Sequence, residues 1–350
     1  MTLCTTTIGA YPKPSYVPVP DWFQDGNTAA TNSIDAYNRY LQNRPDNTEI
    51  LLDRATQEVV QEQVHLGIDF PTDGEIRREN YIHYHCRHLD GIDFSVLTEK
   101  VMRSGAWINV VPTITGRIRP REHFLPADWK IAQAATDRPV KMTLPGPVTM
   151  SDSLVDMCYG DDKELCQALA DALNVEILAL AEAGCRRIQV DEPVFARKPE
   201  KALAYGIECL ERCFHGVPRE VTRVTHICCG YPATVDDEQY FKASPEAYFR
   251  LAGPLDEAEI DAVSLEDAHR PNDLTLLEQF ARTTVILGVI AIARSRVESA
   301  EEVQSRLQQA LEHIDADRLI AAPDCGLGML DHETVTAKLR NMVQAAKGGG

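Results

Sequence analysis

The sequence predicts an α/β fold of the (β/α)8 TIM-barrel type, and three observations support that class. Eight short, mostly apolar segments recur along the 350 residues, as expected of parallel strands that are buried on both faces. Helical patterns lie between several of these segments. Polar and metal-binding side chains stand at the segment ends, which is where barrels of this type carry their active sites. We therefore expect a single catalytic domain over residues 1–350.

The predicted elements alternate along the chain. The helix at 47–67 spaces its apolar residues at helical intervals, and the helix at 163–184 ends at Gly184, the residue type that a helix C-cap prefers. Further helices are expected at 301–314 and 332–346. The predicted strands are 5–9, 68–73, 140–144, 187–191, 223–228, 262–266, 285–290 and 319–322.

Two stretches interrupt this alternation. Residues 17–46 are rich in Pro, Asn and Asp, so an irregular N-terminal segment is expected there. Residues 93–126 contain alternating apolar positions broken by Pro112 and Gly116, which predicts an inserted hairpin. Both insertions follow predicted barrel strands, so they can cover the carboxyl ends of the strands.

Composition and charge exclude several classes of protein. The net charge is −18, which argues against nucleic acid or an anionic membrane as a partner. The sequence has no run of eighteen apolar residues and no signal peptide at its start, so a cytoplasmic protein is expected. The ten cysteines follow no regular framework, and reduced thiols are expected. The oligomeric state is left open.

Four residues at strand ends form a candidate metal site. His226 and Cys228 are two positions apart on a predicted strand, so both side chains point to the same side. Cys325 from the last strand and Glu266 from the sixth complete a zinc-type donor set. The alternative is that the cysteines are small buried hydrophobes, and spacing alone leaves both interpretations open. Cys229 points the other way and is expected to pack.

Such a site suits thiol chemistry. A free thiol has a pKa of about 8.5, so little of it is ionised at neutral pH. Coordination to zinc deprotonates it, and the resulting thiolate is still a nucleophile. An open zinc position also suits metal-assisted hydrolysis. Spacing does not separate these two reactions.

A series of motifs resembles the catalytic C-terminal barrel of the cobalamin-independent methionine synthase family, in its short "core" form. The resemblance runs through nearly the whole chain, in the family's order. It implies a (β/α)8 barrel and a zinc site for the sulfur of homocysteine, with His226, Cys228, Glu266 and Cys325 as ligands. The motifs are Thr-Thr-Thr-Ile-Gly at 5–9, Asp-Gly-Glu at 73–75, Arg-Pro-Val-Lys at 138–141, Pro-Gly-Pro-Val-Thr at 145–149, Ile-Gln-Val-Asp-Glu-Pro at 188–193, Thr-His-Ile-Cys at 225–228, Ser-Leu-Glu at 264–266 and Pro-Asp-Cys-Gly-Leu at 323–327.

The resemblance also implies an amino-acid pocket. Glu75 and Asp191 match the carboxylates that hold the substrate ammonium group, and two carboxylates near one ammonium give charge-assisted hydrogen bonds. Ile8 and Gly9 match the loop that receives the substrate carboxylate. Among these residues, Glu266 and Asp191 are the predicted catalytic pair.

The chain departs from the family pattern on the methyl-donor side. The family's Ile-Gly-Ser is Ile-Gly-Ala here, so Ala10 removes a hydroxyl donor. The motif Tyr-Asp-Ile-His-Ser-Pro, whose His assists transfer from folate, is Ile-Ala-Ile-Ala-Arg-Ser at 290–295. The Trp expected as a pterin platform is absent from 151–160. Methyl folate is a poor donor without acid assistance, so a more reactive donor is expected, such as a methyl-corrinoid or a sulfonium.

The sequence therefore predicts a zinc-dependent methyltransferase that acts on a thiol, foremost homocysteine, to give methionine. Its partners are then the small thiol and a methyl donor, for example a corrinoid protein. One alternative is an alkyltransferase to another thiol such as coenzyme M, similar to epoxyalkane transferase. A zinc-free decarboxylase of the uroporphyrinogen type and a non-catalytic metal-binding or thiol-binding protein are two others.

Several further charged residues lie close in sequence to the candidate site residues. A solvated segment is the preferred interpretation of the cluster that follows Glu75, with anion binding as the alternative. Lys141 is expected to pair inside the barrel. Asp267 and His269, which follow Glu266, are candidates for supporting the metal ligands or relaying a proton, and Arg294 and Arg296 for anion contact. The cluster after Glu75 comprises Arg77, Arg78, His83, His85 and His88.

Overall fold

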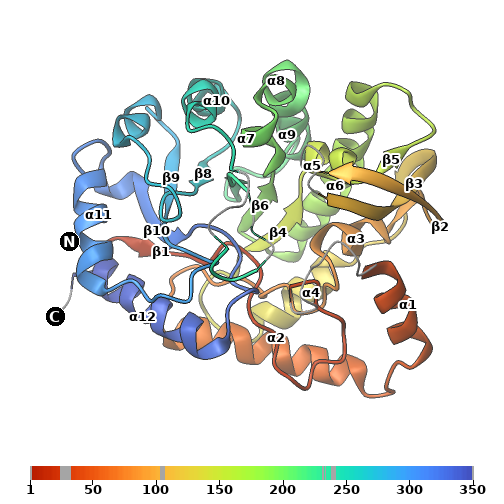
Figure 1. The fold of residues 1–350 in the computed structure, drawn as a ribbon, viewed down its shortest axis with the longest axis horizontal. Coiled ribbons are helices and arrows are strands. Elements are labelled where there is room, and N and C mark those ends of the chain that lie inside the picture. The colour runs from red at the N-terminus through yellow and green to blue at the C-terminus, as the bar shows by residue number, and fades with distance from the viewer. Residues whose placement is uncertain are drawn as a thin grey trace.

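A computed structural model describes residues 2–23, 33–102, 107–230, 232, 234–237 and 242–348 (Figure 1). It shows an α/β fold built on a curled sheet of seven parallel strands. The strand order is β1-β10-β9-β8-β7-β6-β4. The strands are β1 (Cys4–Thr5), β4 (Met142–Pro145), β6 (Arg187–Asp191), β7 (Thr222–Ile227), β8 (Ala262–Leu265), β9 (Thr284–Ile290) and β10 (Leu319–Pro323).

The second predicted strand, 68–73, pairs only through isolated bridges. Thr6, next to β1, bridges Phe70, and Thr72 bridges Lys141, next to β4. Both bridges are parallel. The segment therefore lies between the two edge strands of the curled sheet.

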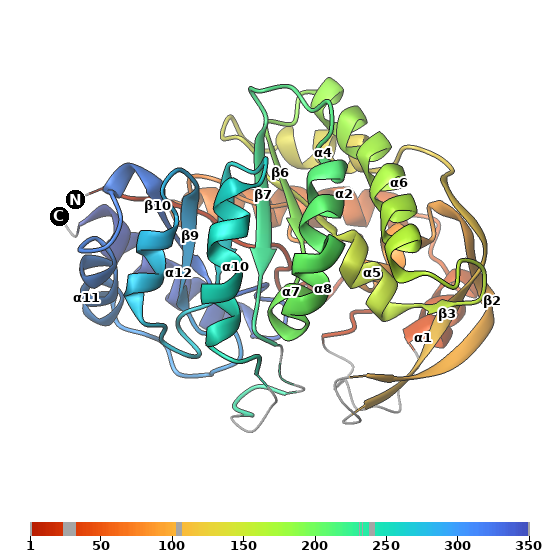
Figure 2. The same cartoon turned by 90° about the horizontal axis from the view of Figure 1, so that it is seen from above.

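Helices cover the outer face of the sheet (Figures 1 and 2). Asp161 caps α6 by accepting a hydrogen bond from the backbone of Glu164, and Gly184 ends α6 at φ +113, as the sequence predicts. The helices are α1 (Ser33–Gln42), α2 (Thr48–His65), α3 (Tyr81–Cys86), α4 (Leu125–Gln133), α5 (Pro147–Ser153), α6 (Asp162–Ala183), α7 (Val194–Arg197), α8 (Pro199–Lys201), α9 (Ile207–Cys213), α10 (Glu246–Glu257), α11 (Ala300–Ala310) and α12 (His332–Lys347). None of them is long and apolar enough to cross a membrane.

Two hydrophobic clusters occupy the two faces of the sheet. In β9, Val285 and Leu287 belong to the large cluster that packs under the helices, whereas Ile286 belongs to a small separate cluster. This alternation follows from the two-residue period of a strand. The small cluster fills the inner face with Ile8, Val224, Ala262, Ile286, Ile320 and Ala322.

A long antiparallel pair stands apart from the parallel sheet (Figure 2). Its strands are β2 (Leu89–Met102) and β3 (Trp107–Pro120), and the short β5 (Val155–Asp156) pairs with β3 in parallel. The pairing begins at Leu89 and ends at Pro120, so it starts earlier than the predicted range 93–126. The end of that range belongs to α4.

The prediction of irregular structure over 17–46 is wrong for helix α1. Ile34 of α1 is buried, and the ring of Tyr37 lies 4.2 Å from the guanidinium of Arg87, which also covers Phe94 of β2 at 4.1 Å. These contacts hold the helix against the antiparallel pair. The prolines that suggested a loop all lie outside the helix.

Candidate metal centre and thiol pocket

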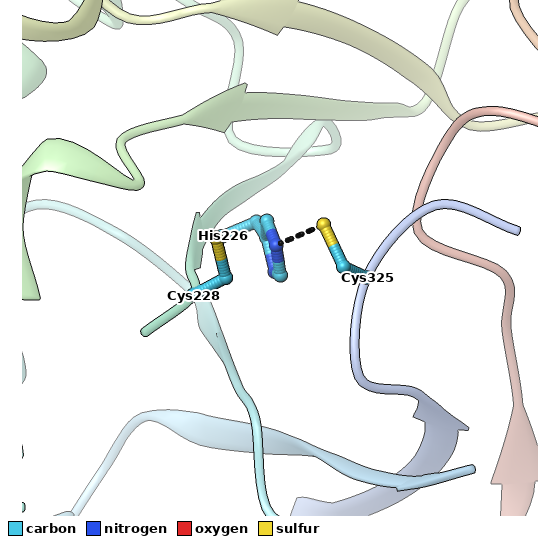
Figure 3. A group of neighbouring side chains, drawn as sticks. All are labelled: His226, Cys228 and Cys325. Atoms are coloured by element: carbon cyan, nitrogen blue, oxygen red, sulfur yellow. Dashed lines mark hydrogen bonds between the residues drawn. The ribbon is translucent and has the colours of Figure 1, made fainter. Parts of the chain in front are cut away.

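Three of the four predicted metal ligands meet at the carboxyl ends of the strands. The ligand atoms of His226, Cys228 and Cys325 all lie within 4.8 Å of one another. Nε2 of His226 is 3.3 Å from the sulfur of Cys325, although the two residues are 99 positions apart (Figure 3). His226 and Cys228 are buried and Cys325 is half-buried. The arrangement offers one nitrogen and two sulfur donors to a single ion.

The strands explain how this cluster forms. His226 lies on β7 and Cys228 directly after it, so the two-residue period points both side chains to the same side. Nδ1 of His226 lies 2.9 Å from the hydroxyl of Ser264 on the neighbouring β8. That contact turns Nε2 toward Cys325, and it supports a ligating histidine through its second nitrogen.

The two sulfur atoms differ in their proton affinity. A hydrogen bond from Cys325, together with His226, holds the pKa of Cys228 well below its usual range. The same hydrogen bond and burial raise the pKa of Cys325 well above its usual range. One hydrogen bond thus joins the two sulfur atoms, and cysteines ligate a soft or borderline cation as thiolates.

Glu266 follows β8 and lies near the cluster without joining it. One carboxylate oxygen, Oε2, accepts a hydrogen bond of 2.8 Å from the backbone of Cys229. The other, Oε1, is buried and has no hydrogen-bond partner. Burial, then the charges of Asp324 and Cys228, raise the pKa of Glu266 well above its usual value. A buried unpartnered carboxylate oxygen beside a His-Cys-Cys cluster fits a fourth ligand for zinc.

Cys229 lies outside the cluster, as its position on the strand predicts. Its sulfur accepts a hydrogen bond of 2.8 Å from Arg270. Burial raises the pKa of Cys229 to about 12, so it stays a thiol. All ten cysteines are free, in agreement with the expectation of reduced thiols.

The carboxylate of Glu75 lies against the loop that contains Gly9. Its Oε1 accepts hydrogen bonds from Thr143 at 2.8 Å and from Arg78 at 3.1 Å. A side chain on Gly9 would meet that oxygen at 2.6 Å, so only glycine fits there. Glu75 also has φ +56, an uncommon backbone conformation for this residue type. The carboxylate is thus placed on the predicted substrate loop at some conformational cost.

Asp191 ends β6 and is also buried. Its Oδ1 accepts a hydrogen bond of 2.7 Å from Gln189. Burial, then the charge of Glu75, raise the pKa of Asp191 to about 7, and His226 opposes the shift. The charge of Glu75 and that of His226 in the cluster therefore both act on the Asp191 carboxylate.

Comparison with known proteins places this site in a family. The chain matches the catalytic domain of cobalamin-independent synthases over residues 3–348. The protein belongs to the cobalamin-independent methionine synthase family. It is a methyltransferase of that family, with a His-Cys-Cys site at positions 226, 228 and 325.

The similarity to relatives extends over almost the full length of both chains. The methionine synthase of Saccharolobus solfataricus is 29% identical over 99% of this chain and 94% of its own, and that of Thermococcus kodakarensis is 28% identical over 99% and 93%. The structure of a B12-independent methionine synthase from Shewanella sp. W3-18-1 in complex with selenomethionine superposes with a TM-score of 0.87. It is 30% identical and covers 99% of this chain and 97% of that one.

Two residues expected near the candidate metal ligands serve the scaffold. Both oxygens of Asp267 bind Arg306, at 2.6 and 2.8 Å. Nε2 of His269 accepts backbone hydrogen bonds from Ile292 and Ala293, at 3.0 and 3.2 Å. Burial lowers the pKa of His269 to about 3, so its ring is neutral and can accept them. This histidine organises the backbone at Ile292 and Ala293, in the segment that follows β9.

The prediction of a solvated cluster after Glu75 is wrong for several of its members. Arg78, His83 and His85 are all buried. Burial lowers the pKa of His83 to about 3 and that of His85 well below its usual value. Neutral rings on α3, one of them edge-on to Phe94 at 5.8 Å, do not form an anion site.

The two arginines proposed for anion contact separate in the structure. Arg296 pairs with Glu302 at 2.9 Å on the surface, whereas Arg294 lies 3.5 Å from the carbonyl of His269. Arg294 therefore contacts the backbone three residues after Glu266.

Sequence reasoning missed the residues that hold the site in place. Arg78 and Thr143 fix Glu75, Gln189 fixes Asp191, and Ser264 orients His226. The available signal was spacing, because each lies two or three positions from a predicted site residue or on the next strand. Arg78 and Gln189 contact a residue two or three positions away, whereas the partners of Thr143 and Ser264 come from distant parts of the chain.

Proposed function

We propose that the protein is a zinc-dependent methyltransferase that methylates the sulfur of homocysteine to give methionine. The observation that carries this proposal is the position of the His226, Cys228 and Cys325 cluster beside the buried carboxylates Glu75 and Asp191. A thiol and an ammonium group on one small molecule match these two halves of the site. The Shewanella relative, solved with selenomethionine, supports an amino-acid product of this kind.

His226, Cys228, Cys325 and Glu266 would hold the zinc ion. When bound there, zinc supplies the positive charge that keeps a thiol deprotonated at neutral pH. The orphaned Oε1 of Glu266 supports its place in this set. Glu266 would be the most weakly held of the four ligands, because a carboxylate is the hardest donor among them.

Glu75 and Asp191 would bind the substrate ammonium group. Both carboxylates are buried, and their hydrogen bonds with Arg78, Thr143 and Gln189 use only Oε1 of Glu75 and Oδ1 of Asp191. A cation between them forms charge-assisted hydrogen bonds and offsets the cost of two buried negative charges. The Ile8–Gly9 loop would receive the substrate carboxylate. Binding at both ends would aim the sulfur at the metal ligands.

The methyl donor would be more reactive than a methyl folate, and a methyl-corrinoid is the first candidate. Methyl folate needs acid assistance to its amine leaving group. The family's donor-side imidazole is replaced by the segment 290–295, whose backbone is instead bound by neutral His269. Residues 290–295 themselves contain no acidic side chain.

We also infer that the segment 70–72 completes an eight-stranded barrel. Its bridges to Thr6 on one side and Lys141 on the other support closure between β1 and β4. Closure would bring Glu75, which follows this segment, to the same end of the barrel as Asp191 and Cys325.

Zinc content and methyl transfer test the proposal together. The wild type is expected to bind one zinc ion and to methylate homocysteine from methylcobalamin, while Cys325→Ala loses both properties. Cys4→Ala, which removes an exposed cysteine, is the matched control. Methyl folate in place of methylcobalamin tests the donor. A metal-free wild type with full activity contradicts the proposal.

Alkyl transfer to another thiol, such as coenzyme M, is the second candidate. Ala10 favours it, because the hydroxyl that family members direct at the substrate carboxylate is missing here. A panel of thiols assayed with one donor separates the two. Preference for a thiol without an ammonium group would favour this candidate.

A further inference from the structure

Gln189 lies between the two ends of the predicted substrate pocket. We propose that it is a positioning residue that fixes the distance between the ammonium subsite and the carboxylate subsite, and that Lys141 satisfies the other side of its amide. This role rests on the proposed amino-acid thiol as substrate. It assigns the two residues to substrate alignment, not to bond making.

The contacts of Gln189 join parts of the chain that are far apart in sequence. Its Nε2 donates to the carbonyl of Ile8 at 2.7 Å and to Oδ1 of Asp191 at 2.7 Å. Its Oε1 accepts from Nζ of Lys141 at 2.5 Å. Gln189 is 0% exposed and Lys141 is 1% exposed. Every donor and acceptor of this amide group is therefore used inside the protein.

Only one orientation of the amide satisfies these partners. A backbone carbonyl and a carboxylate can only accept, so the amide nitrogen must face Ile8 and Asp191. The amide oxygen then faces Lys141, which donates. If the amide were rotated by half a turn, its oxygen would face the oxygen atoms of Ile8 and Asp191. These buried groups would then lose their hydrogen bonds. The network therefore behaves as a rigid link.

This link joins the two predicted subsites directly. The carbonyl of Ile8 belongs to the loop that would receive the substrate carboxylate, and Asp191 would receive the ammonium group. Because one nitrogen atom binds both, the spacing between the subsites is set by a single amide. Oδ1 of Asp191 is occupied by Gln189, which leaves Oδ2 for the ligand.

Glu75 is held by a separate set of contacts. Thr143 and Arg78 both donate to its Oε1, whereas the partners of Gln189 are Lys141, Ile8 and Asp191. Loss of Gln189 should therefore misplace one of the two carboxylates and spare the other. The expected defect is a partial loss of ammonium recognition.

The test compares two ligands that differ only in the ammonium group. Homocysteine and 4-mercaptobutyrate share the thiol, the chain length and the carboxylate. Their affinities for the zinc-loaded enzyme are measured by calorimetry, without a methyl donor. Gln189→Leu is expected to lower the affinity for homocysteine by about tenfold to a hundredfold, which is the range for a hydrogen bond to a charged group. The affinity for 4-mercaptobutyrate should change about threefold or less.

Further variants separate positioning from folding. Gln189→Glu keeps the shape and the contact with Lys141 but removes the donor, so it should match Gln189→Leu. Lys141→Met should cause a smaller loss with the same ligand preference. Lys338→Met, which removes a buried lysine bound to Glu298, is the control and should leave the ratio of affinities unchanged. Melting temperatures show whether each variant folds.

The outcomes are distinguishable. A wild type that binds both ligands equally overturns the proposed amino-acid substrate, and this role with it. A wild type that prefers homocysteine, combined with a Gln189→Leu enzyme that keeps the same preference, overturns the positioning role alone. Rescue by Gln189→Glu would also overturn it, because the donor would then be unnecessary.

Discussion

Oδ2 of Asp324 accepts a hydrogen bond of 2.6 Å from the backbone of His269, 55 residues earlier in the chain. Its Oδ1 accepts from the backbone of Asp267 and Ala268, at 2.9 and 2.8 Å. One buried carboxylate thus binds the three residues that follow Glu266. Because Asp324 directly precedes Cys325, the contact ties two ligand-bearing segments together.

Asp324→Asn should loosen this connection. An amide can replace one oxygen acceptor but not both, so at least one buried backbone N–H loses its partner. We expect a loss of about 1–3 kcal/mol in stability and a zinc affinity lower by about tenfold or more. Thermal unfolding and chelator competition measure the two effects. Asp273→Asn, at an exposed helix cap where Asn serves equally well, should change neither.

Glu266→Gln tests the fourth ligand. The amide oxygen can still accept from the backbone of Cys229, so the fold should be retained. The negative charge is lost, and we expect zinc affinity to fall by about tenfold to a hundredfold. Chelator competition monitored by metal analysis gives the value. Unchanged affinity would mean that this carboxylate serves only the backbone of Cys229.

Glu75→Gln should weaken the thiol substrate without affecting the metal. The amide oxygen can keep the contacts with Thr143 and Arg78, while the charge that faces the ammonium group disappears. We expect KM for homocysteine to rise by about tenfold to a hundredfold, with zinc content as in the wild type. Loss of zinc in this variant would point to a structural role for Glu75.

Stability should depend on pH through Lys141. Burial lowers the pKa of Lys141 to about 7 from an ordinary 10.5, so the unfolded chain binds the proton more tightly than the folded one. The stability contribution is present above pH 10.5 and is lost as the pH falls toward 7. In the wild type, the free energy of unfolding should change through this group by up to about 1.4 kcal/mol per pH unit. In Lys141→Met this dependence should disappear.

Urea unfolding at several values between pH 7 and 10 measures the effect. The free energy of unfolding of the wild type should increase relative to that of Lys141→Met as the pH rises. Lys163→Met, at an exposed position paired with Glu208, is the control and should show no such trend. A constant difference for Lys141→Met would mean that this lysine stays charged in the folded protein.

The sequence by itself determined the alternation of strands and helices and three of the metal-centre residues. The reason is that strand parity is local: a two-residue spacing points His226 and Cys228 to one side in any sheet. The C-cap at Gly184 was predictable for the same reason, since its signal lies within one turn of the helix. Helix α1 was not predicted, because the many turn-forming residues of 17–46 indicated an irregular segment.

Only the tertiary structure decided which polar residues support the site. Gln189 meets the carbonyl of Ile8, 181 residues away in sequence, and Asp324 meets residues more than fifty positions earlier. Arg78 looked like a surface residue until the fold buried it against Glu75. Such pairs form when the sheet curls and brings distant strand ends together, and no local pattern encodes that closure.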